Sequence, residues 1–142
     1  MSSIKVVVAG PIPRDTISTY ENIIITRYGC VTHPVIALAK LLREEGTVVP
    51  ISNIHKKDKA NIIEEFSGHD NIDFSGINSD EDRGTVIFLD FKDQNNREEK
   101  QLACMNPIRP DHIEPHLDAH AFVFVPITDF EIALSTLMFI KA

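Results

Sequence analysis

The sequence predicts an α/β fold in which helices flank a mainly parallel sheet. Two apolar runs, residues 4–9 and 121–125, are rich in β-branched and aromatic side chains, as in strands that are covered on both faces. Segments of helical period, such as residues 34–46 and 59–66, lie between the strand-like runs. Strands that alternate with helices form right-handed βαβ units and therefore a mainly parallel sheet.

Length and charge limit the class of protein. The chain of 142 residues has the length of one domain, so we expect a single α/β unit over residues 1–142. The net charge of −7 argues against a nucleic-acid partner, because phosphate backbones require a cationic face. The basic stretch at residues 56–59 is short and interrupted by Asp58, which favours a solvated helix start.

The cysteines and the N-terminus indicate the compartment. Cys30 and Cys104 lie far apart and lack a metal-type spacing, which favours reduced thiols in a cytoplasmic protein. The chain enters its first strand soon after Met1, so we expect no targeting segment. No apolar run approaches the ~20 residues that a membrane-spanning helix needs. We therefore expect a cytoplasmic protein with no membrane partner.

The first third of the chain is predicted to hold two strands and a helix. The strand at residues 4–9 stops at Gly10, and the prolines that follow predict a turn leading to Asp15. Residues 22–26 form a second short strand. A helix is expected from Pro34 to near Gly46, since apolar side chains recur there with helical period, at Val35, Leu38, Ala39 and Leu42.

The middle of the chain first continues the alternation of strands and helices and then departs from it with a hairpin. Residues 47–51 are predicted to form a strand and residues 59–66 a helix with Ile62, Ile63 and Phe66 as its buried face. A further short strand is expected at residues 72–74. Two strands, residues 85–91 and 100–105, flank a polar turn and predict an antiparallel hairpin.

The last third is predicted to hold a short helix at residues 111–117, a buried strand at 121–125 and a final helix from about Asp129. The apolar stripe of that helix consists of Phe130, Leu134, Leu137 and Met138. The sequence ends at Ala142, directly after this helix, where a βαβ pattern next supplies a strand. We therefore expect a sheet that is incomplete at the C-terminus.

Asp15 is the main candidate for function. In open α/β sheets, ligands bind in the crevice at the carboxyl ends of strands, where Asp15 and the turn at Gly29 are expected. An ionised carboxylate only accepts hydrogen bonds, so it can take two hydroxyl hydrogens of a sugar or polyol. The structural alternative is an Asp that stabilises the turn by bonding nearby backbone.

The other motifs are weaker. His112, His116 and His120 have a helical spacing that can hold zinc, but Pro115 interrupts it, so we favour a solvent-facing polar helix. Residues 67–70 are interpreted as a helix end and a turn. A nucleophilic pair of Cys30 and His33 lacks an orienting third residue. Neither G-x-x-x-x-G-K-[ST] nor G-x-G-x-x-G occurs, so no phosphate-binding loop is recognised.

Two segments carry a resemblance to a known family. Residues 6–15, with Gly10 and Asp15 at their separation, are similar to the first strand of the PfkB (ribokinase-like) carbohydrate kinases and to its sugar-binding Asp. Residues 28–42 resemble the first signature of that family, a Gly-Gly turn followed by an Asn and an Ala-rich helix. The chain therefore resembles the N-terminal half of such a kinase, with a Rossmann-like ribokinase fold and a small β hairpin or lid.

The resemblance implies a substrate-binding site in this chain and a C-terminal half that carries the remaining sites of the kinase. It places substrate-binding residues at Asp15, Gly29, Cys30 and His33, although Tyr28 replaces the first Gly and His33 replaces the Asn of the signature. It implies ATP and Mg²⁺ as cofactors, but the family places the catalytic Asp, the Gly-rich anion hole and the ATP site in the C-terminal half. We therefore assign no catalytic, cofactor-binding or metal-binding residue to this chain.

Two functions from different classes remain open. The first is the substrate-binding half of an ATP-dependent kinase that phosphorylates a hydroxyl of a sugar or sugar-like compound and is inactive alone. The second is a non-catalytic module that binds a small polyol or nucleoside. In either case, the lid strands at residues 85–105 can pair with their counterparts in a homodimer.

Overall fold

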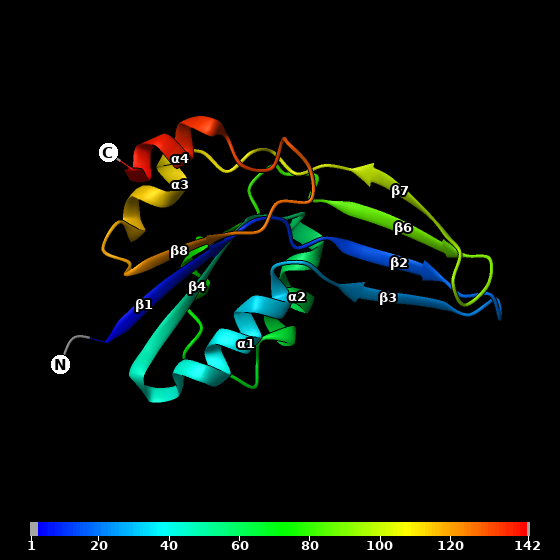
Figure 1. Ribbon diagram of the computed structural model, residues 1–142, viewed down its shortest axis with the longest axis horizontal. Coiled ribbons are helices and arrows are strands. Elements are labelled where there is room, and N and C mark those ends of the chain that lie inside the picture. Colours follow the sequence, from blue (N-terminus) through cyan, green and yellow to red (C-terminus); the bar gives the residue numbers. More distant parts are fainter. Residues whose placement is uncertain (1–2, 142) are drawn as a thin grey trace.

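The computed structural model describes residues 3–141 and shows two four-stranded sheets (Figure 1). The first has the strand order β5-β4-β1-β8 and is parallel throughout. The second has the order β3-β2-β6-β7 and projects beyond the helices; we call it the lid sheet. The strands are β1 (Ile4–Ala9), β2 (Arg14–Ser18), β3 (Ile24–Tyr28), β4 (Gly46–Asn53), β5 (Ile77–Asn78), β6 (Val86–Phe91), β7 (Arg97–Ala103) and β8 (Ala121–Phe124).

Helices cover both faces of the parallel sheet (Figure 1), α1 and α2 on one face and α3 and α4 on the other. Val8 of β1 belongs to the same buried cluster as Val35 of α1, whereas the adjacent Val7 belongs to the cluster of Ile113 in α3. Successive strand residues point to opposite faces, so a strand covered on both sides needs an unbroken apolar run. The α-helices are α1 (Thr32–Leu42), α2 (Lys59–Glu65), α3 (Pro110–Ile113) and α4 (Leu134–Lys141), and the 3-10 helices are η1 (Arg43–Glu45), η2 (Lys56–Asp58), η3 (Phe74–Gly76) and η4 (Glu114–His116).

The predicted parallel sheet and the predicted hairpin are confirmed. β1 pairs in parallel with β4 and with β8, and β6 pairs antiparallel with β7. The hairpin turn is closed by Asp93, whose carboxylate accepts hydrogen bonds from the backbone N–H groups of Asn95 and Asn96. β7 begins at Arg97, three residues earlier than predicted, because cross-strand pairing continues to Phe91.

The turn predicted from Gly10 to Asp15 is wrong at its end, because Arg14 and Asp15 belong to a strand. Residues 14–18 form strand β2, which pairs antiparallel with β3 and parallel with β6. Ile17 is the only large apolar residue in this segment, so the local strand signal is weak. β2 is stabilised by hydrogen bonds to the two strands that flank it. One of these, β6, comes much later in the chain, so no local sequence signal reveals the pairing. Consequently Asp15 lies within the lid sheet and not at the end of β1.

Two other boundaries differ in the first half of the chain. The expected strand at residues 72–74 is reduced to one parallel bridge between Ile72 and Val48, followed by η3 and then β5. Asp73 ends the extended segment because its carboxylate accepts a hydrogen bond from the N–H of Ser75. Helix α1 begins at Thr32, two residues before Pro34, and places that proline in its first turn.

The solvent-facing interpretation of the histidine segment is wrong for His116. α3 and η4 share this segment, and His116 is buried with its Nδ1 atom lacking a hydrogen-bond partner. Burial lowers the pKa of His116, which favours the neutral imidazole. His120 lies outside the helical turns, and its Nδ1 accepts a hydrogen bond from the backbone N–H of Lys5.

The final helix also differs from its prediction. It begins at Leu134 and not near Asp129, and the four residues of its predicted apolar stripe are exposed. Leu134 is 71% exposed and Met138 is 64% exposed, while the helix packs on the core through Ile140. The strand expected to be buried at residues 121–125 is also wrong in its burial: it forms β8, an edge strand whose residues are exposed or half-buried, with Val123 among the exposed ones. Within residues 3–141, no helix is long and apolar enough to cross a membrane.

Candidate functional site

A cavity of about 540 Å³ opens between one face of the lid sheet and the turn that precedes α1. Strands β2, β3, β6 and β7 contribute to the sheet side of the cavity, and Gly29 of the turn and His33 of α1 line the opposite side. The lining consists of Asp15, Ile17, Thr19, Tyr20, Ile25, Arg27, Tyr28, Gly29, His33, Leu89, Phe91, Gln94 and Arg97. Such a volume suits a small molecule.

Strand register explains why these side chains face the same space. Asp15 lies opposite Arg27, and Ile17 lies opposite Ile25 in the β2–β3 pair. Ile17 is also the register partner of Leu89 in β6. Because side chains alternate along a strand, the residues two apart on each strand share one face of the lid sheet. This face is apolar in its middle and carries charged groups at its ends.

Asp15 and Gly29 are in close approach. A Cβ atom added at Gly29 would lie 2.6 Å from Oδ2 of Asp15, so only glycine leaves room for the carboxylate in this position. The turn is fixed by a 3.1 Å hydrogen bond from the N–H of Gly29 to the carbonyl of Pro13. The backbone of Gly29 is not in the left-handed region. Glycine is therefore required here by space and not by backbone conformation.

The pKa of Asp15 is raised above its usual value, chiefly by partial burial and further by the negative charge of Glu99. The positive charges of Arg27 and His33 oppose this rise. Partial burial with no salt bridge to Arg27 within residues 3–141 leaves the carboxylate free to accept hydrogen bonds from a ligand.

His33 reaches the cavity from the first turn of α1. Thr32 fixes this turn because its hydroxyl donates to the carbonyls of Tyr28 and Gly29, at 3.0 and 3.2 Å. His33 lines the cavity together with Asp15 and Gly29, so the structure brings together three of the four residues that the sequence singled out. An imidazole can donate to or accept from a hydroxyl.

Cys30 is adjacent to this group but faces elsewhere. Its backbone is left-handed, with φ of 52°, and its thiol donates a 3.4 Å hydrogen bond to the carbonyl of Val125. Burial and the negative charge of Glu131 raise the pKa of Cys30 to about 11. The thiol is therefore protonated at neutral pH and does not line the cavity.

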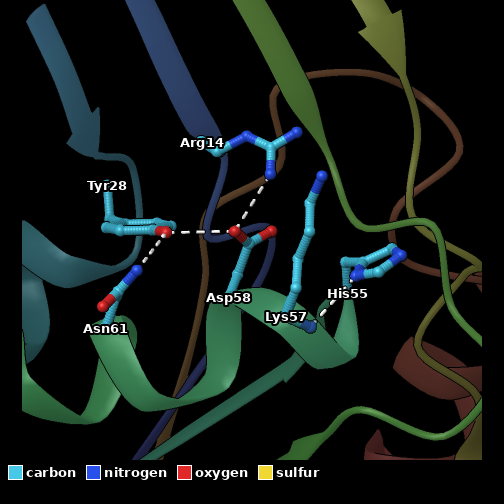
Figure 2. Close-up of polar contacts among 6 residues, drawn as sticks. All are labelled: Arg14, Tyr28, His55, Lys57, Asp58 and Asn61. Atoms are coloured by element: carbon cyan, nitrogen blue, oxygen red, sulfur yellow. Dashed lines mark hydrogen bonds and ion pairs between the residues drawn. The ribbon is translucent and has the colours of Figure 1, made fainter.

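A polar network connects strands β2 and β3 of the lid sheet to η2 and α2 (Figure 2). Oδ1 of the buried Asp58 in η2 accepts hydrogen bonds from Arg14 of β2, at 3.1 Å, and from the hydroxyl of Tyr28 in β3, at 3.0 Å. The amide of Asn61 in α2 donates to the same hydroxyl at 3.5 Å. Nδ1 of His55 accepts from the N–H of Lys57 and caps η2. The stretch at residues 56–59 thus contains a structural carboxylate that the prediction of a solvated helix start missed.

Most cavity residues escaped the sequence analysis because β2 was interpreted as a turn. With β2 recognised, the alternation of Asp15, Ile17 and Thr19 would have indicated a shared face. The alternation of Ile25 and Arg27 in β3 gives the same signal. Arg97 and Gln94 have no local signal, since only the pairing of β6 with β7 brings them to the cavity.

ATP and Mg²⁺ are implied by the family resemblance alone. Among residues 3–141, no group of three or more His, Cys, Asp or Glu side chains can hold a metal ion. Asp15 is the only carboxylate in the lining of the cavity that the described residues form. We therefore assign no ATP or Mg²⁺ contact to the residues of this chain.

Comparison with protein-family models gives no match, and comparison with curated proteins gives none either. Solved structures do match. A pyrophosphate-dependent kinase in the ribokinase family superposes with a TM-score of 0.70 at 16% identity, over 90% of this chain and 43% of its own. This chain has a ribokinase-like fold. The fructokinase of Halothermothrix orenii (TM-score 0.64, 19% identity) matches over 85% of this chain and 46% of its own.

A further match is an uncharacterized sugar kinase from Pyrococcus horikoshii, with a TM-score of 0.67 and 17% identity over 84% of this chain and 42% of its own. The predicted resemblance is thereby confirmed at the level of the fold. This chain spans less than half the length of each of these three kinases. Similarity at these identities shows the fold, and the substrate and activity are argued from the cavity.

Proposed function

We propose that this chain forms the substrate-binding side of an ATP-dependent kinase that phosphorylates a hydroxyl of a sugar or sugar-like compound. The observation that supports it best is the placement of Asp15 in a cavity whose wall at Gly29 has no side chain. The structural neighbours include a fructokinase, an uncharacterized sugar kinase and a kinase in complex with a pyrophosphate analog and myo-inositol. One is described in complex with ATP and another as pyrophosphate-dependent, so the donor is the least constrained part of the proposal.

Binding and orientation are the steps that these residues can perform. The Asp15 carboxylate accepts hydrogen bonds from two hydroxyl groups, and His33 contributes a third polar contact. Ile17, Ile25 and Leu89 give the apolar floor on which the carbon face of a sugar can lie. Phosphoryl transfer depends on positioning and on neutralising phosphate charge, and we assign the second requirement to a further polypeptide segment.

Ligand binding by the chain is the direct test. Isothermal titration with myo-inositol, D-fructose, D-ribose and adenosine is expected to detect binding of at least one compound. Asp15→Asn is expected to weaken that binding by about tenfold or more, because hydrogen bonds to charged groups are worth roughly 1.5–3 kcal/mol. The matched control is Asp80→Asn, an exposed carboxylate outside the cavity. Equal affinity for wild type and Asp15→Asn would contradict the proposal.

The exposed apolar surface of α4 and β8 supports a second half that covers it. Phe130, Leu134 and Met138 are large and exposed, and the last two lie one helical turn apart in α4. Exposed apolar patches of this kind mark interaction sites. We propose that a further polypeptide segment, carrying the donor-binding part of the kinase, packs there. The chain alone is then inactive, and phosphate transfer by residues 1–142 to any sugar or nucleoside in a 31P NMR assay would contradict this.

The alternative is a binding module that holds a small polyol or nucleoside without turnover. It draws on the same cavity, whose volume and mixed polar and apolar lining suit a small molecule. The two functions differ in the role of the α4 surface. A module that works alone gains solubility and keeps its ligand affinity when Leu134→Gln and Met138→Gln are combined. A kinase half is expected to lose association with its second half.

We also propose that the chain forms a homodimer through the edge strands of the lid sheet. β3 and β7 are the edges of the lid sheet, and their backbone groups are open to pairing. Ile24 of β3 and Leu102 of β7 are exposed apolar residues on these edges. Light scattering after size exclusion is expected to give twice the chain mass of 15.9 kDa. A monomer at all concentrations would contradict the dimer without affecting the binding site.

A further inference from the structure

Asp58 is a buried carboxylate that does not serve the helix on which it lies. It occupies the N-cap position of α2, where an Asp side chain ordinarily accepts a hydrogen bond from a backbone N–H of the first turn. The Asp58 side chain makes no such bond, and the preceding turn η2 is capped by His55 instead. Only 9% of the Asp58 side chain is exposed. A buried charge requires partners, and those of Asp58 lie elsewhere in the chain.

Both partners of Asp58 belong to the lid sheet (Figure 2). Its Oδ1 atom accepts hydrogen bonds from the guanidinium of Arg14 in β2 and from the hydroxyl of Tyr28 in β3. Arg14 and Tyr28 lie 44 and 30 residues away in the sequence, and they are directly opposite each other in the β2–β3 pair. One oxygen atom therefore connects both strands of this register pair to the start of α2.

This register pair lies between the two positions that form the candidate site. On one side of it, the N–H of Gly29 donates to the carbonyl of Pro13 at 3.1 Å. On the other side, Asp15 lies opposite Arg27. The two residues that bind the Asp58 carboxylate are thus adjacent in sequence to Asp15 and Gly29, whose close approach forms the site.

Tyr28 connects the Asp58 carboxylate to the cavity directly. It is a lining residue of the cavity, and its hydroxyl donates to Asp58 at 3.0 Å. The amide of Asn61 in α2 contacts the same hydroxyl at 3.5 Å. Burial raises the pKa of Tyr28 above its usual value, so the hydroxyl stays protonated and remains a donor.

We propose that Asp58 is a positioning residue for the cavity. By holding the pair of Arg14 and Tyr28, it fixes the place at which the Asp15 carboxylate meets Gly29, and thereby the orientation of the hydroxyl groups that Asp15 binds. Asp58 does not line the cavity, so it acts only through its two partners. The inference rests on the proposed function for the ligand, whereas its geometric part concerns this chain alone.

The pKa of Asp15 tests the geometric part without a ligand. Partial burial is the main cause of its raised value, and Asp58 is not among the charges that act on it. In Asp58→Ala, the pKa of Asp15, followed by 13C NMR, is expected to fall toward the ordinary 3.8, because a displaced carboxylate is more exposed. Asp58→Asn keeps an acceptor oxygen for both donors and is expected to restore the wild-type value.

Ligand affinity is the second readout. Isothermal titration with myo-inositol, D-fructose, D-ribose and adenosine is performed at a temperature at which every variant is folded. Asp58→Ala is expected to bind about tenfold more weakly than wild type, and Asp58→Asn to recover most of this loss. Tyr28→Phe removes one of the two hydrogen bonds and is expected to shift both readouts in the same direction, which keeps the test valid if Asp58→Ala does not fold.

A control and the outcomes separate this inference from the proposed function. Asp118→Ala breaks the ion pair with Lys5 outside the cavity and is expected to change neither readout. An unchanged pKa of Asp15 or an unchanged affinity in Asp58→Ala overturns the inference and leaves the proposed function intact, because a residue that only stabilises the fold moves neither. If wild type binds none of the four compounds, the proposed function fails, and the pKa of Asp15 still decides whether Asp58 positions it.

Discussion

Gly29→Ala is the substitution that tests the site with the least disturbance of the fold. The added Cβ would lie 2.6 Å from Oδ2 of Asp15, and its next neighbour is Cγ of the same side chain at 3.7 Å. The backbone of Gly29 lies outside the left-handed region, so alanine adopts it without strain. The substitution therefore acts almost entirely on the position of one carboxylate.

The size of the effect follows from this geometry. Ordinary contact with a Cβ atom begins at 3.4 Å, so the carboxylate oxygen has to move by about 0.8 Å. A displacement of this size misaligns hydrogen bonds that are each worth roughly 1.5–3 kcal/mol, so we expect ligand affinity to fall about 10- to 100-fold. Stability is expected to change by less than about 1 kcal/mol, because alanine also restricts the unfolded chain.

The assay combines isothermal titration with thermal unfolding. Gly68→Ala is the matched control, since no atom lies within 4 Å of a Cβ at that position. In an Asp15→Asn/Gly29→Ala double variant, the two losses of affinity are expected to be far from additive, because both act through the same side chain. Unchanged affinity in Gly29→Ala, or full additivity in the double variant, would refute the contact between Gly29 and Asp15 as the basis of binding.

Three further predictions concern the groups around the cavity. Asp58→Ala is expected to lower the free energy of unfolding by about 1–3 kcal/mol, because it leaves Arg14 and Tyr28 without their hydrogen-bond acceptor. Urea denaturation measures this change, and an unfolding midpoint equal to that of wild type would contradict the prediction. Because burial raises the pKa of Asp15, ligand affinity should decline on acidification with a midpoint above the ordinary 3.8. For the same reason, Asp15→Asn should raise the melting temperature at pH 7, where burial disfavours the charged carboxylate. The substitution should have no such effect below pH 3.8, where the side chain is neutral in both wild type and variant. Cys30 should react with iodoacetamide far more slowly than free cysteine at pH 8, since its pKa is about 11; rapid alkylation would show a different environment.

The parallel sheet was predictable because its evidence is local. β1 has to be apolar on both faces, and an unbroken apolar run records this requirement in consecutive residues. The same signal at residues 121–125 predicted the strand β8 correctly but not its burial, because β8 is the edge of the sheet. The β6–β7 hairpin was predictable for a related reason, since Asp93 and its neighbours form a turn of recognisable composition. In these elements the residue types of consecutive positions, and not the distant partners, carry the signal that made them predictable.

β2 shows where local sequence signals are not sufficient to predict a strand. Its residues are mostly polar, and its hydrogen bonds go to β3 on one side and to β6, some seventy residues later, on the other. The missed strand explains why the cavity was only partly predicted. Asp15, Gly29 and His33 lie in one segment of the chain, whereas Arg97 and Phe91 reach them only through strand pairing.

The predicted apolar stripe of α4 failed for a different reason. Periodicity shows which residues share a face of a helix, but not whether that face meets the core. Here, Leu134 and Met138 point away from the sheet, and Ile140 makes the contact. The exposed stripe became evidence about a partner surface only when the packing of the helix was known.

The sequence by itself determined that this chain is an α/β protein with a ribokinase-like first strand, a Gly29 turn and a carboxylate at Asp15. These features depend on residues close together in the chain, where spacing and composition carry the information. Only the tertiary structure decided that Asp15 lies in a second sheet, that Gly29 gives it room, and that two arginines share its cavity. Those facts depend on which strands pair and in which register, and register is set by contacts between segments that are far apart in sequence.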